Sequence, residues 1–185
     1  MLLDPLLDDV LKPITQFAHD WMHTFVVHGV WNVTLFLLLE CLIASGVKDA
    51  LQQLESYVAL WTLPSRHKSN TDNLSDAFSS SRWKSAKRAK YFKCTASDAI
   101  SLFGIVACYV TTVFLAAGYC EHECSAYILL ADLLDLLVAS PHGTVTPDAL
   151  RAAGEAFLRA CVDAGWKDRL IPKFHWIDHP FGYRA

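Results

Sequence analysis

The sequence predicts an all-α protein, a helical bundle of about five to seven helices with one very apolar central helix. Three observations lead to this fold class. Apolar residues recur at steps of three and four along much of the chain, no segment alternates as a strand does, and several boundaries carry helix-capping residues. A chain of 185 residues suits a single domain over 1–185 and is long enough to bury a sizeable core.

Composition narrows the class of protein without fixing it. Hydrophobic residues make up 53% of the chain, which is high for a soluble protein and low for one that crosses a membrane many times. The net charge of −3 argues against a protein that coats DNA, so attraction to phosphate needs a local patch. Six cysteines fall mostly in apolar helical patterns, which favours reduced thiols in the cytoplasm or nucleus. The acidic N-terminus does not read as a secretory signal.

The first third of the chain predicts three helices. Residues 2–12 form a short amphipathic pattern that ends at a proline. Residues 14–45 are strongly apolar, with Gly29 as the one breaker before Gly46. Residues 47–60 then place their apolar side chains on one helix face.

Residues 64–93 predict a loop that is polar in its first part and basic in its second. The segment 64–81 is rich in Ser, Asn and Asp without periodicity, which is typical of a mobile loop. Six Lys or Arg and no acid follow between residues 82 and 93. This cluster could bind nucleic-acid phosphates with aromatic rings stacking on bases, bind anionic lipid headgroups, or lie in a solvated loop. The basic residues are Arg82, Lys84, Lys87, Arg88, Lys90 and Lys93, and the aromatic residues are Trp83, Tyr91 and Phe92.

The run from Ala99 to Cys120 is the predicted central helix, because it holds 22 residues without a formal charge. Thr95 and Asp98 before it form a plausible helix cap. An apolar run of about 20 residues can span a bilayer, and a basic flank can fix its cytoplasmic end. The same run can be the buried helix of a soluble domain. A small membrane protein anchored by a helix at 99–119, with a second at 25–45, therefore stays open as the alternative.

The last third predicts two amphipathic helices and an irregular tail. Residues 126–140 carry two aspartates on the more polar face of the predicted helix. Thr146, followed by Pro and Asp, is the clearest helix start in the chain. The helix that it opens, 147–164, has opposite charges four residues apart on its outer face, as a water-exposed helix does. Residues 171–185 are rich in aromatic residues and predict an irregular tail.

Two pairs of histidines have the spacing of metal ligands on a helix. His19 and His23 lie four residues apart, and His175 and His179 repeat that spacing. Neither pair has an evident set of further ligands, and prolines beside the second pair disfavour a long helix there.

Cys120, His122 and Cys124 form the densest group of potential metal ligands and give a weak zinc-site hypothesis. A polar turn between two apolar helices explains the same residues. No phosphate-binding glycine loop, GxSxG motif or Cys/His protease arrangement is present in the sequence.

Four short stretches follow one another along the chain: DWMH at 20–23, KCTASD at 93–98, PHGTVTP at 141–147 and PKFHWIDH at 172–179. Together they resemble the later part of eukaryotic cut-and-paste transposases of the CACTA and Kyakuja–Dileera–Zisupton type, and host proteins derived from them. The first stretch looks like the D-x-x-H signature that follows the second catalytic acid of that group. The last looks like the PKxHxxxH segment before the final catalytic acid.

The resemblance implies a parent chemistry of two-metal phosphoryl transfer on an RNase H-like core, with three carboxylates holding divalent ions. It places two of those acids before residue 1 and the third beyond residue 185. Only Asp20 and His23 match signature positions, as accessory or structural residues, so no catalytic residue can be assigned. The resemblance thus implies a non-catalytic relic of the helical insertion, nuclear or cytoplasmic. It would have no cofactor of its own, and DNA would be its expected partner at the basic cluster.

Overall fold

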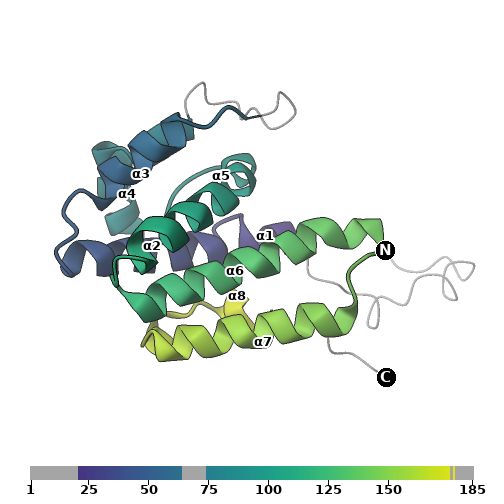
Figure 1. The fold of residues 1–185 in the computed structure, drawn as a ribbon. Coiled ribbons are helices and arrows are strands. Elements are labelled where there is room, and N and C mark those ends of the chain that lie inside the picture. Colours follow the sequence, from purple (N-terminus) through teal and green to yellow (C-terminus); the bar gives the residue numbers. More distant parts are fainter. Residues whose placement is uncertain (1–20, 64–73, 176, 178–185) are drawn as a thin grey trace, which may run out of the picture.

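The computed structural model describes residues 21–63, 74–175 and 177, and all regular structure in that part of the chain is helical (Figure 1), which confirms the all-α prediction. The α-helices are α1 (Trp21–Phe25), α2 (Val30–Ala44), α3 (Ala50–Ala59), α4 (Ser80–Ala89), α5 (Ala96–Tyr109), α6 (Glu121–Ala139), α7 (Pro147–Asp163) and α8 (Pro172–His175). Three 3₁₀ turns, η3 (Leu74–Phe78), η5 (Ser140–His142) and η6 (Lys167–Arg169), and one π-helix, η4 (Val110–Leu115), join them.

The central helix of the bundle is α2, whereas the sequence pointed to the run at 99–120. Eleven of its 15 residues are buried, and it contacts α1, α3, α5 and α6. In Figure 1, α2 runs behind α5 and α6. A helix that is apolar on all sides requires neighbours on all sides, and only the position of α2 supplies them.

The helix predicted over 14–45 is divided into α1 and α2 at Gly29. A Cβ atom at Gly29 would collide with the carbonyl groups of Thr24 and Phe25, so the two helices can approach this closely only at a glycine. His28, just before it, has a φ of 48°, which turns the chain between the helices. Residues 1–20, with the helix predicted at 2–12, lie outside the residues that the structure describes.

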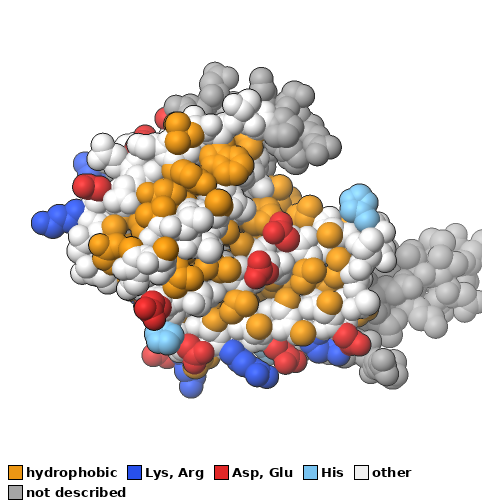
Figure 2. Space-filling model, in the orientation of Figure 1, with side chains coloured by type: hydrophobic (Ala, Val, Ile, Leu, Met, Phe, Trp, Pro, Cys, Tyr) orange, Lys and Arg blue, Asp and Glu red, His pale blue; other side chains and the backbone are white. Residues whose placement is uncertain are grey.

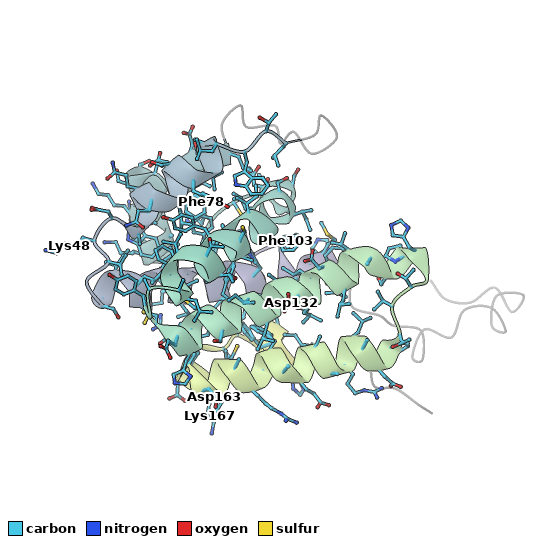
Figure 3. The ribbon with its side chains drawn as sticks, in the orientation of Figure 1. Lys48, Phe78, Phe103, Asp132, Asp163 and Lys167 are labelled. Atoms are coloured by element: carbon cyan, nitrogen blue, oxygen red, sulfur yellow. The ribbon has the colours of Figure 1, made fainter. Side chains whose placement is uncertain are left out.

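Residues 74–78 and 80–89 are helical, so the predicted loop is wrong over this part of 64–93, while residues 64–73 lie outside the description. Two buried aromatic side chains hold η3 and α4 on the bundle: the Phe78 ring packs 5.2 Å from Phe92, and the Trp83 ring packs 5.4 Å from Phe36 of α2. Figure 3 labels Phe78. The polar composition of the segment hid these anchors, because burial of a few aromatic rings can override a weak local preference.

The run at 99–120 forms α5 and η4, and its predicted cap is confirmed. The backbone N–H of Asp98 donates to Thr95 Oγ1 at 3.1 Å, and that of Thr95 donates to Asp98 Oδ2 at 3.3 Å. Most of its bulky side chains are buried or partly buried, Val113 and Tyr119 are exposed, and most of its other exposed residues are small. The small exposed residues are Ser97, Gly104, Cys108, Thr111 and Thr112. This helix is therefore amphipathic by side-chain size, which explains why its hydropathy is high although only half of it is buried.

Helices α6 and α7 lie antiparallel along one side of the bundle (Figure 1). The predicted start at Thr146 is confirmed, because the N–H of Ala149 donates to Thr146 Oγ1 at 3.2 Å. On the outer face of α7, Arg159 pairs with Glu155 at 3.5 Å, so the predicted charge pattern faces solvent. The tail predicted at 171–185 begins with a helical turn, α8, while residue 176 and residues 178–185 are outside the description.

Candidate functional site

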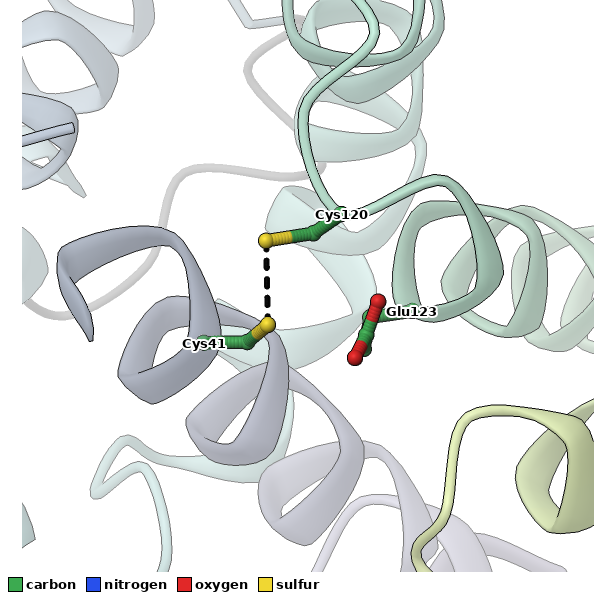
Figure 4. A group of neighbouring side chains, drawn as sticks. All are labelled: Cys41, Cys120 and Glu123. Carbon is green, nitrogen blue, oxygen red and sulfur yellow. Dashed lines mark hydrogen bonds between the residues drawn. The ribbon is translucent and has the colours of Figure 1, made fainter. Parts of the chain in front are cut away.

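Cys41, Cys120 and Glu123 meet where α2 ends and α6 begins (Figure 4). The two Sγ atoms lie 3.0 Å apart, and one potential ligand atom from each residue lies within 4.8 Å of the others. All three side chains are partly buried. Among the residues that the structure describes, this is the one group of three His, Cys, Asp or Glu side chains close enough to share an ion.

The backbone at Cys120 creates this meeting point. Cys120 has φ 45° and ψ 55°, a left-handed conformation that turns the chain from η4 into α6. Glu123 follows three residues later and therefore lies on the same side of the first helical turn. Burial and the neighbouring Cys120 and Glu123 side chains raise the pKa of the Cys41 thiol far above its usual range. Without a cation, the thiol of Cys41 is therefore protonated at neutral pH.

Of the three residues in the zinc hypothesis, Cys120, His122 and Cys124, only Cys120 belongs to this group. His122 is exposed, and Cys124 is buried with its thiol donating to the Tyr119 carbonyl at 3.3 Å. Residues two apart on a helix do not share a face, which explains the separation. The sequence missed Cys41 because it lies 79 residues before Cys120, and no local pattern joins the two.

The histidine pairs cannot be assembled from the described residues, since His19, Asp20 and His179 lie outside them. His23 is exposed on α1. The Lys173 ammonium of α8 donates to the carbonyl of His23 at 2.6 Å and to that of Val27 at 2.8 Å. Partial burial lowers the pKa of Lys173. His23 and Lys173, which belong to the first and last of the four transposase-like stretches, are therefore adjacent. The Lys173 ammonium caps the C-terminal end of α1.

Helix α4 and its cap carry most of the predicted basic cluster on their solvent-exposed surface, here called the basic face. Trp83 and Ala86 are buried and fix the opposite side of the helix to the bundle. The exposed residues of this basic face are Arg82, Lys84, Lys87, Arg88 and Lys90. Lys93 does not belong to it, because its ammonium donates to Ser85 Oγ at 3.2 Å and lies 5.9 Å above the Tyr91 ring.

The aromatic residues of the cluster are not available for stacking as the sequence suggested. Trp83 and Phe92 are buried core residues, with 8% and 2% of their surface exposed. Tyr91 is partly buried, and its ring lies 5.0 Å from that of His28. The stacking hypothesis is therefore wrong for two of the three rings.

A half-open surface cavity of about 500 Å³ adjoins the C-terminal end of α4. Lys90 and Tyr91 line one side, and Asp168 and Arg169 line another. Arg169 also pairs with Glu40 at 3.0 Å. The hollow beside α4 thus has charges of both signs and a tyrosine on its walls.

Among the residues that the structure describes, three helical stretches are long and apolar enough to cross a membrane, judged by length and composition: Trp21–Ala44, which spans α1 and α2, Ala96–Leu115 and Glu121–His142. Within the bundle, 72% of the apolar window of the first is buried, against 50% and 44% for the other two. Most of the apolar residues of Trp21–Ala44 thus lie in the core of the bundle.

Comparison with known proteins identifies no relative: no family description, curated protein or solved structure matches this chain. The class that the fold and the sites define is an all-α protein with a basic surface helix and a thiol–carboxylate cluster.

Proposed function

We propose that this chain is a non-catalytic, nuclear or cytoplasmic helical protein that contacts nucleic acid through the basic face of α4, as its resemblance to a transposase insertion suggests. One observation carries the proposal. A ten-residue helix and its cap present five cations to solvent, and α4 contains no acid. None of the ion pairs found among the described residues involves these five side chains.

The setting of α4 suits phosphate binding. Because Trp83 and Ala86 hold the helix on the bundle, its exposed cations stand on a backbone that is fixed before binding. Cations that neutralise phosphates release condensed counterions, so binding of this kind weakens steeply with salt. The chain as a whole carries a net charge of −3, and we therefore expect attraction to be confined to this face.

The donor groups favour binding over catalysis. Two-metal phosphoryl transfer of the resembled kind uses three carboxylates. The one potential metal group within residues 21–63, 74–175 and 177 holds a single carboxylate, that of Glu123. We therefore assign no phosphoryl-transfer step to the described residues.

The test compares the salt dependence of duplex DNA binding between two variants of equal charge. K84Q/K87Q removes two cations from the basic face, and K48Q/K167Q removes two exposed cations from elsewhere on the bundle, both labelled in Figure 3. Each lost phosphate contact should reduce the slope of log K against log salt by about 0.9. We expect a lower slope for K84Q/K87Q and an unchanged slope for K48Q/K167Q. Equal slopes for wild type and K84Q/K87Q would rule out the basic face as the contact.

A membrane protein is the second candidate function, and the three long apolar helices are the observation that favours it. The packing of α6 weighs against it. Asp132 is exposed near the middle of α6 (Figure 3), and α7, which packs along α6, exposes charged side chains over its length. A span at 121–142 would bring these charges into lipid, where they are costly.

Alkaline carbonate extraction of the expressed chain separates the two candidates. A peripheral or free protein enters the supernatant, and a protein with a membrane-spanning helix stays in the pellet. We expect release. Retention in the pellet, with a known integral protein as marker, would favour the membrane candidate instead.

A further inference from the structure

We propose that Cys41, Cys120 and Glu123 bind one zinc ion, which joins the end of α2 to the start of α6. The inference is independent of nucleic-acid binding. It differs from the sequence hypothesis in two of three ligands, because Cys41 and Glu123 replace His122 and Cys124.

The donor set selects the class of metal. Two thiols and a carboxylate suit a borderline-soft divalent ion such as Zn²⁺, whereas Mg²⁺ and Ca²⁺ take oxygen ligands. Three protein ligands leave the fourth tetrahedral position for water. The hydroxyl of Ser45 lies beside the cluster, 3.3 Å from Cys120 Sγ and 4.0 Å from Cys41 Sγ, where it can hydrogen-bond to a thiolate.

The geometry needs only a small adjustment. A tetrahedral ion with Zn–S bonds of about 2.3 Å sets its two sulfurs about 3.8 Å apart. The two Sγ atoms are at 3.0 Å, and both side chains are partly exposed at the edge of the bundle, so small side-chain rotations can separate them. A disulfide would instead require them to close to about 2.05 Å and would need an oxidant. A disulfide would use only the two sulfurs, whereas a metal ion would also use the carboxylate of Glu123, which has an oxygen within 4.8 Å of both Sγ atoms.

The negative charge of the deprotonated cluster favours binding of a cation. Two thiolates and a carboxylate within 4.8 Å of one another would repel, and a divalent cation bound between them offsets that repulsion. A divalent ion replaces the thiol protons and releases them to solvent. Affinity should therefore rise with pH.

The experiment uses the full chain, reduced with a phosphine, stripped with a chelator and titrated with Co²⁺ as a spectroscopic substitute for Zn²⁺. We expect a sulfur-to-cobalt charge-transfer band that saturates at one equivalent, strengthens with pH and disappears when Zn²⁺ is added. Zn²⁺ should also raise the melting temperature, because it binds the folded chain.

Four variants locate the ion. C41S and C120S should each lose the band, and E123Q should weaken Co²⁺ binding by about tenfold or more. C108S is the matched control, because Cys108 is an exposed cysteine outside the cluster, and it should bind as the wild type does. Circular dichroism without metal checks that each variant is folded.

Two results would overturn the proposal. One is a reduced, folded wild-type chain that gives no charge-transfer band with Co²⁺. The other is a band that survives in both C41S and C120S. If the reduced chain does not bind metal while the oxidised chain is lighter by two hydrogens at Cys41 and Cys120, the pair is a redox pair and the zinc site is excluded.

Discussion

Single buried hydrogen bonds join the three apolar helices of the core. The indole N–H of Trp31 in α2 donates to the hydroxyl of Tyr127 in α6 at 2.9 Å, and that hydroxyl donates to the carbonyl of Phe103 in α5 at 3.3 Å. Both Trp31 and Tyr127 are fully buried. In a core made mainly of Leu, Val and Phe, this chain of bonds fixes how the helices face one another. Figure 3 labels Phe103 on α5.

Tyr127→Phe should destabilise the protein by about 1–3 kcal/mol, because it leaves a buried indole N–H without an acceptor. The measurement is urea unfolding followed by circular dichroism. Thr34→Val is the matched control, since it removes a buried hydroxyl for which the described residues provide no hydrogen-bond partner. That variant should be neutral or more stable by up to about 1 kcal/mol. Equal losses from both substitutions would contradict the role given to Tyr127.

At the junction between α1 and α2, one buried side chain, that of Asn32, links the start of α2 to the segment that follows α4. Asn32 is completely buried and accepts a hydrogen bond from the N–H of Gly29 at 2.9 Å. The side-chain amide of Asn32 donates to the carbonyl of Phe92 at 2.9 Å, and the backbone carbonyl of Asn32 accepts from the N–H of Phe92 at 2.8 Å. The same residue thus shapes the start of α2 and holds the segment after α4 against the core.

Two glycine substitutions test the junction at the scale of helices. Gly29→Ala should destabilise by about 1–3 kcal/mol, because the added methyl group collides with backbone atoms at Thr24 and Phe25. Gly104→Ala is the control: Gly104 is exposed in α5, a Cβ atom there would meet no atom within 4 Å, and alanine should stabilise by about 0.5–1 kcal/mol. Thermal melts of the two variants should shift in opposite directions. A stable Gly29→Ala variant would show that α1 and α2 can separate.

At the scale of the molecule, the face over α5 and α6 and the basic face of α4 differ in their charge. The face over α5 and α6 mixes hydrophobic side chains with uncharged ones, and a few acids lie among them, while basic side chains gather toward the margins of this view (Figure 2). Asp132 lies within this face and Asp163 and Lys167 lie at its edge (Figure 3). The basic face of α4 is a separate surface, carried by a different helix. A net acidic protein can therefore present one local cationic face, which the DNA-binding proposal requires.

The sequence by itself determined the fold class and several helix boundaries. The caps at Thr95 and Thr146 and the end of α7 at Gly165, where φ is 71°, depend on contacts within four residues, so a local pattern suffices to predict them. The charge pattern of α7 is local in the same sense. These features would be present in any fold in which the same segments are helical.

Only the tertiary structure decided which apolar helix is central, which residues anchor the segment at 74–92, and which cysteines meet. Helix α2 and the run at 99–120 are both strongly apolar, and their burial differs because of their neighbours. Phe78 and Trp83 became core residues through rings on other segments. Cys41 joined Cys120 because two helix ends meet across 79 residues of chain. Packing is a non-local property, and a single sequence carries no direct signal of it.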